Sequence, residues 1–248
     1  MRTNGYYHGA WTVTCQTVYS GYSMTASGAA SQRTSVALDH ASQAEHGHQA
    51  TLEDGLDFVN TLEHERGHSQ DHLSSMAAAL DWLGQHDLMH EEAHRELVER
   101  FSDDEEGAQR VLARVHRVRA AMRELVDASV ARRPPEGRAL ERINRILRAP
   151  YSYYLVPSHD GVSLDHRHEG DPVEGALARL AESIAREVSQ GHPERLRICA
   201  DEECRWVFHD TSPTGRRKWC DMTTCGNRAK AARHRERQRS AEGAATAG

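Results

Sequence analysis

Four cysteines near the end of the chain have the spacing of a metal site. Cys199 and Cys204 form one pair and Cys220 and Cys225 another, each with four residues between its members and fifteen between the pairs. Zinc prefers four soft ligands in a tetrahedron, and a shell of four thiolates is a common closed, structural arrangement. The spacing therefore predicts one structural Zn²⁺ bound by these four side chains.

A basic segment accompanies and follows the second cysteine pair. A metal-nucleated fold that leads into a basic helix can hold a polyanion, so we predict that this segment contacts DNA through phosphates and some base edges. Its candidate contact residues are Arg216, Arg217, Lys218, Arg228, Lys230, Arg233, Arg235, Arg237 and Arg239. At helical spacing, Lys230, Arg233 and Arg237 share one side, and Arg228, Arg235 and Arg239 share another.

The same residues allow other interpretations. Four thiolates on one Zn²⁺ leave a charge of about −2, which nearby cations could neutralise instead of binding DNA. The cations close enough in sequence to do so are Arg216, Arg217, Lys218 and Arg228. The distal helix could also face a partner's acidic surface or water. Asn227 could pair with adenine or make a structural hydrogen bond.

Charge is unevenly distributed along the 248 residues. Residues 195–239 contain twelve Lys/Arg and six Asp/Glu, although the whole chain has a formal charge of −6. An acidic body with a basic end indicates a nucleic-acid or acidic-partner module joined to another part. Neither a signal segment nor a run of about 18 apolar residues is present, which favours a cytoplasmic protein with metal-binding rather than disulfide-bonded cysteines.

Apolar periodicity indicates a mainly α (α+β) fold. Residues 1–50 and 240–248 predict a disordered extension and a disordered tail. Residues 52–192 predict a mainly helical domain, with stripes at steps of three and four and a break at Pro134-Pro135. Within it, Tyr151 to Val156 and Val162 to Leu164 predict a β-hairpin. A last helix ends at Gly191.

The segment 195–239 predicts a small zinc finger. Residues 205–208 and 217–219 are interpreted as two strands around the turn 212–215. The first cysteine pair would lie in the loop before this hairpin, and the second pair at the start of the following helix. Such a loop, hairpin and helix around one metal is treble-clef-like, and the metal would decide whether so small a unit folds.

Two motifs resemble known families. The pattern Cys199-x4-Cys204-x3-Phe208-x-Asp210, followed by Trp219-Cys220 and by Cys225-Gly226-Asn227-Arg228, resembles the CGNR zinc finger. Upstream, residues 56–62 and 73–83 are similar to the opening of the ABATE domain. Together the resemblance covers roughly residues 52–239. It implies a bacterial, stress-induced transcription regulator whose finger contacts DNA and whose helical domain senses a ligand or a partner.

One motif points to a different class of protein. His64-Glu65-Arg66-Gly67-His68 has the H-E-x-x-H pattern in which two histidines on a helix bind catalytic zinc. Gly67 weakens such a helix, Arg66 places a positive charge near the metal, and the chain contains 17 histidines. We therefore predict a non-enzymatic protein, with incidental metal binding by His64, His68 and His72 as the alternative.

The runner-up function is an adaptor that binds a protein or RNA. Trp206, Phe208 and Trp219 could stack on RNA bases, but they are also the only evident core of the finger. Likewise, Tyr151, Tyr153 and Tyr154 could line a ligand pocket or pack within their hairpin. A single small finger binds DNA weakly, which favours a homodimer.

Overall fold

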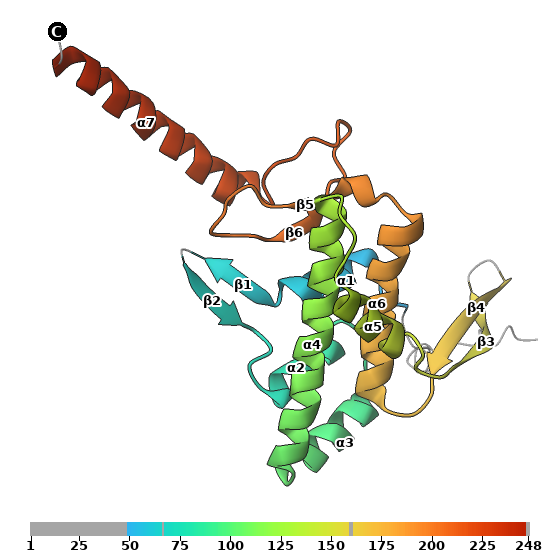
Figure 1. Ribbon diagram of the computed structural model, residues 1–248. Helices are drawn as coiled ribbons and strands as arrows, with labels where there is room; N and C mark the ends of the chain where they lie inside the picture. The colour runs from blue at the N-terminus through green and yellow to red at the C-terminus, as the bar shows by residue number, and fades with distance from the viewer. Residues whose placement is uncertain (1–48, 66, 159–160, 247–248) are drawn as a thin grey trace, which may run out of the picture. The chain divides into compact units, whose positions relative to one another are not determined.

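The structure is a computed structural model that describes residues 49–65, 67–158 and 161–246 (Figure 1). The predicted disordered extension lies outside these residues, except for its last two positions. In chain order the elements are α1 (Leu52–Asn60), β1 (Leu62–Glu65), β2 (His68–Asp71), α2 (Met76–Gln85), α3 (Glu91–Ser102), α4 (Glu105–Val130), α5 (Gly137–Ile146), β3 (Tyr151–Ser158), β4 (Gly161–His168), α6 (Pro172–Gln190), the 3₁₀ turn η2 (Pro193–Arg195), β5 (Leu196–Ile198), β6 (Val207–His209), the π-turn η3 (Met222–Gly226) and α7 (Asn227–Thr246).

The core is helical, as the apolar stripes predicted. Helices α1, α4 and α6 pack on one another, and α2 and α5 also pack on α4. The buried faces of α4 and α6 repeat at steps of three and four, which is the spacing of one side of a helix. Their central members are Val115, Val118, Met122 and Leu125 on α4 and Leu177, Leu180 and Ile184 on α6.

Local sequence signals fix the ends of these helices. Thr51 caps α1, because its hydroxyl accepts from the Asp54 N–H while the Asp54 carboxylate accepts from the Thr51 N–H. Helix α4 ends at Val130, four residues before Pro134-Pro135, and α6 ends at the predicted Gly191. None of the described helices has the length and apolar composition needed to cross a membrane.

Three two-stranded antiparallel sheets accompany the helices. The predicted hairpin forms from β3 and β4, with Tyr151 opposite His168. Its tyrosines Tyr151, Tyr153 and Tyr154 are exposed, and the first two rings pack edge to face at 5.4 Å. The β1–β2 hairpin was not predicted, because its strands are short and polar.

The hairpin of the finger is not the predicted one. Strand β6 pairs with β5, which precedes the first cysteine, with Ile198 opposite Val207. Residues 217–219 form no strand, because the Arg217 N–H donates to the Asp210 carboxylate rather than to a strand. The predicted pairing of residues 205–208 with 217–219 is therefore wrong, although the first of these segments does contain most of a strand.

The β5–β6 hairpin shares the core of the helical region. Leu196 and Val207 are fully buried among its apolar side chains. The Asn60 side chain, at the end of α1, donates to the Val207 carbonyl and accepts from the Val207 N–H, both at 2.9 Å. All described residues accordingly belong to one compact unit, Asp39–Gly248.

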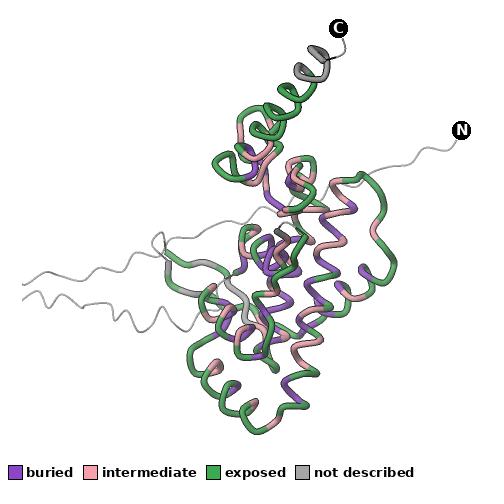
Figure 2. The backbone as a smooth tube through the Cα atoms, turned by 90° about the vertical axis from the view of Figure 1, so that its left-hand side faces the viewer, coloured by how far each residue is buried: buried purple, intermediate pink, exposed green. Residues whose placement is uncertain are grey.

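Helix α7 is longer than predicted, and its described side chains, up to Ser240, form no buried face. It continues to Thr246, where we expected a disordered tail from residue 240. The reason lies in its composition, since Ala, Glu, Arg and Gln are all good helix formers. Every residue from Lys230 to Ser240 is exposed, and the described part of the C-terminal helix is almost uniformly green in Figure 2.

Candidate metal centre and basic helix

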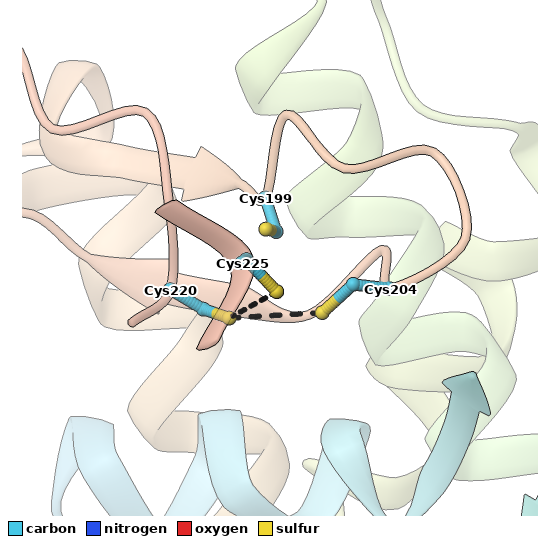
Figure 3. Close-up of side chains that lie close together, drawn as sticks. All are labelled: Cys199, Cys204, Cys220 and Cys225. Carbon is cyan, nitrogen blue, oxygen red and sulfur yellow. Dashed lines mark hydrogen bonds between the residues drawn. The ribbon is translucent and has the colours of Figure 1, made fainter. Parts of the chain in front are cut away.

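The four predicted cysteines gather at one point. Cys199 follows β5, Cys204 lies in the turn before β6, Cys220 lies in the loop before η3, and Cys225 lies within η3. Their sulfur atoms all lie within 4.8 Å of one another and point toward a common centre (Figure 3). The Cys204–Cys220 and Cys220–Cys225 sulfur distances are 3.6 and 3.7 Å.

These distances fit a zinc ion. Sulfur atoms placed 2.3 Å from a tetrahedral zinc are separated by about 3.8 Å, close to the observed separations and far longer than a disulfide bond. Cys199 and Cys225 are buried and the other two half-buried. Four protein ligands leave no open coordination position, which is typical of a structural rather than a catalytic site.

The thiols of the cluster differ in their pKa values. Burial raises the pKa of the Cys204 thiol to about 11 and also raises that of Cys220. For Cys199, burial is outweighed by the N–H groups of Cys220 and Asp201, and its pKa is lowered. At neutral pH the metal-free cluster thus keeps protons on some thiols, and a bound dication would displace them.

Each residue of the Cys-Gly-Asn-Arg motif has a definite role in the structure. A Cβ on Gly226 would lie 2.5 Å from the Met222 sulfur and 3.3 Å from the Trp219 ring, so a larger residue would fit only if the flexible Met222 side chain moved. Asn227 donates its side-chain amide to the Thr223 carbonyl at 3.0 Å, which is the structural alternative considered above. Arg228 donates to the Cys225 sulfur at 3.3 Å and pairs with Asp201.

A buried carboxylate, Asp210, holds the loop that precedes the second cysteine pair. It accepts from the Ser212 N–H at 3.0 Å and from the Arg217 N–H at 2.8 Å. The Ser212 side chain, these N–H groups and Arg197 favour its charged form against the cost of burial, and they lower its pKa to about 2. Sequence reasoning included Asp210 only as part of a family pattern and missed this role.

We expect Asp210→Asn to destabilise the zinc-loaded protein by about 2–3 kcal/mol at pH 7, since the amide cannot satisfy both N–H groups. A lowered pKa contributes stability above the ordinary value of about 4, and this contribution is lost as the pH falls toward 2. Because protons also displace zinc from thiolates at low pH, the comparison is made at pH 7. Urea unfolding of the zinc-loaded proteins measures the difference in the free energy of unfolding, with the exposed Glu141→Gln as control; an unchanged value in Asp210→Asn would contradict the prediction.

The predicted DNA-contact residues divide into two groups. Arg217 is used within the finger: it donates to the Trp219 carbonyl at 2.8 Å and to the Cys220 carbonyl, and its guanidinium lies over the Phe208 ring. Arg228 donates to the Cys225 sulfur of the cysteine cluster. The remaining candidates are exposed, namely Arg216 and Lys218 beside the cluster and Lys230, Arg233, Arg235, Arg237 and Arg239 on α7.

The H-E-x-x-H segment does not form a helical metal site. His64 lies on β1 and His68 on β2, in a hairpin that pairs Glu65 with His68. The His64 ring lies 2.9 Å from the Ser69 hydroxyl, and the His72 ring pairs with Glu63 at 3.0 Å. Among the described residues, the four cysteines are the only group of three or more side chains arranged to hold a metal.

A helical region that shares its core with a module of four clustered cysteines is the architecture of a zinc-finger protein. Comparison with known families agrees with the predicted resemblance. The model of the ABATE family, described as "Putative stress-induced transcription regulator", matches residues 55–191, and that of the CGNR zinc finger matches residues 195–238. The chain belongs to the ABATE family and carries a CGNR zinc finger. A search of curated proteins found no match.

Proposed function

We propose that this regulator binds duplex DNA through α7 and that a single structural Zn²⁺, held by the four cysteines, orients this helix. The observation that carries the proposal is the surface of α7. A helix that buries no face gains nothing from packing, so its sequence serves either solvent or a partner. Between Lys230 and Ser240 this surface presents five Lys/Arg and one Glu.

The charge of α7 exceeds what the metal centre needs. Arg228 already lies against the Cys225 sulfur, whereas Arg233, Arg235, Arg237 and Arg239 all follow more than one helical turn later. The one acidic residue, Glu236, pairs with Arg239 at 3.2 Å. Lys230, Arg233, Arg235 and Arg237 have no carboxylate partner among the described residues. Exposed cations without a carboxylate partner, on two sides of one helix, suit contacts with the phosphate rows of a groove.

The alternative of RNA binding through stacked aromatic residues has less support. Phe208 is buried under the Arg217 guanidinium, while Trp206 and Trp219 are only half-exposed. The finger thus uses at least one of its rings as core. We also propose that the protein is not an enzyme, because its metal centre is closed and the H-E-x-x-H segment lies on a hairpin.

The test is duplex binding by the zinc-loaded protein across a salt series. We expect one zinc per chain and an affinity that falls on a log–log plot with a slope of roughly −4 to −6, because each neutralised phosphate contributes about −0.9. A single-stranded competitor of the same length should bind less tightly. If duplex DNA does not bind even at low salt while zinc is present at one per chain, the proposed function is wrong.

A further inference from the structure

A cavity in the helical region is surrounded by arginines. It has a volume of about 340 Å³ and lies where α4, α5 and α6 meet. Arg114 and Arg117 from α4 and Arg142 and Arg145 from α5 line it, with Glu174 of α6 as the only acidic lining residue. Four guanidinium groups around one cavity are unexpected in the acidic part of an acidic chain.

Helical spacing explains how the arginines converge. Each helix contributes two arginines three residues apart, and residues at that spacing share one side of a helix. Helices α4 and α5 pack directly on each other, so the two pairs face the same space. Below them, Val118 and Ile146 are buried, with exposed fractions of 3% and 4%. The cavity therefore combines an apolar floor with a cationic rim.

The ion pairs elsewhere in this region set the arginines of the cavity apart. On α4 alone, Arg110, Arg119 and Arg123 each pair with a carboxylate at 3.2 Å or less. By contrast, Arg117, Arg142 and Arg145 have no carboxylate partner among the described residues. Arg114 reaches only 3.6 Å from Glu174, beyond hydrogen-bond distance. Four cations thus face one carboxylate, and although water screens the exposed guanidinium groups, a bound anion would reduce the repulsion that remains between them.

We propose that this cavity binds a phosphorylated small molecule, with phosphate groups on the four arginines and an apolar portion on the floor. Guanidinium groups bind phosphate oxygens in a bidentate manner, and they suit this role better than lysine would. The volume lies at the lower end of the range of small-ligand pockets. The proposal deepens the ligand-sensing role that the family resemblance implies for the helical region, and it rests on that role; what it adds is the chemical class of the ligand.

The test is calorimetric titration of the full-length, zinc-loaded protein in the absence of DNA. The probes are ATP and inorganic pyrophosphate, with adenosine as the uncharged control. We expect both phosphate compounds to bind, adenosine to bind at least tenfold more weakly than ATP, and added salt to weaken the binding of the phosphates. Failure of both ATP and pyrophosphate to bind would overturn the proposal.

Matched variants assign the binding to the cavity. Arg142→Gln/Arg145→Gln should weaken ATP binding at least tenfold, while Arg95→Gln/Arg100→Gln removes the same charge from exposed positions on α3, outside the cavity, and should leave ATP binding unchanged. Thermal unfolding checks that both variants fold. We expect Arg142→Gln/Arg145→Gln to melt no lower than the wild type, because the substitution removes charges of the same sign that lie close together. An equal loss of ATP affinity in the two double variants would overturn the proposal.

The phosphates that bind these arginines could instead belong to the DNA backbone. A salt series of duplex DNA binding distinguishes DNA phosphates from those of a small molecule. If the cavity binds a small ligand, Arg142→Gln/Arg145→Gln leaves the slope of DNA binding unchanged. A slope reduced by about two, together with no binding of ATP, would show that the arginines contact DNA and would overturn the small-ligand proposal. Ligand binding is measured without DNA. A protein whose α7 does not bind DNA would therefore still report whether the cavity binds ATP.

Discussion

Cys220→Ser should abolish zinc binding and unfold the finger. Its sulfur lies 3.6 Å from the Cys204 sulfur and 3.7 Å from the Cys225 sulfur, so the substitution removes one of the four corners of the tetrahedron. Structural zinc contributes on the order of 10 kcal/mol to the folding of such a module. We expect amide protection to be lost over residues 199–226, measured by hydrogen exchange, with less than one-tenth of a zinc per chain remaining by metal analysis.

The effect should extend into the helical region. Leu196 and Val207 are fully buried there, and full burial of such side chains contributes about 1.5–3 kcal/mol each. If zinc loss releases the β5–β6 hairpin, the remaining helices should melt about 10 °C lower. Cys15→Ser is the control, since that cysteine is not one of the four predicted zinc ligands. Full zinc content and unchanged exchange in Cys220→Ser would contradict the assignment of the site.

The cysteine cluster and the main helices could be predicted from sequence because their signals are local. Four soft ligands at regular spacing identify a metal site without knowledge of the fold, and the stripe Val115, Val118 and Met122 identifies a helix by periodicity alone. Helix α3 was missed for the converse reason. Its only buried residue is Leu97, which leaves no stripe to detect.

The pairing of β5 with β6 could not be predicted, because it depends on contacts distant in sequence. Strand β5 has only three residues, and nothing in Leu196-Arg197-Ile198 distinguishes it from a loop. The helical core around Leu196 and two hydrogen bonds between the Asn60 side chain and the Val207 backbone hold the hairpin in place. Asn60 and Val207 are 147 residues apart in the sequence. The strand expected over residues 217–219 does not form, because the Arg217 N–H donates to the buried Asp210 carboxylate, a contact that the sequence pattern does not reveal.

Neutralisation of one side of α7 should nearly abolish DNA binding. The variant Lys230→Gln/Arg233→Gln/Arg237→Gln removes three cations that share a side of the helix and have no carboxylate partner among the described residues. Each lost phosphate contact lowers the salt slope by about 0.9, so the slope should fall from about −5 to about −2. At 0.1 M salt the affinity should fall by about 10²- to 10³-fold, as measured by fluorescence anisotropy.

Folding should be unaffected by this substitution, because the three side chains are exposed and glutamine is as good a helix former as lysine or arginine. The matched control is Arg95→Gln/Arg138→Gln/Arg148→Gln, which changes the net charge equally from exposed positions of the helical region. If binding depended only on net charge, the two triple variants would lose the same affinity. A selective loss in the α7 variant, with zinc content and melting temperature unchanged in both, would locate the DNA contact on this helix.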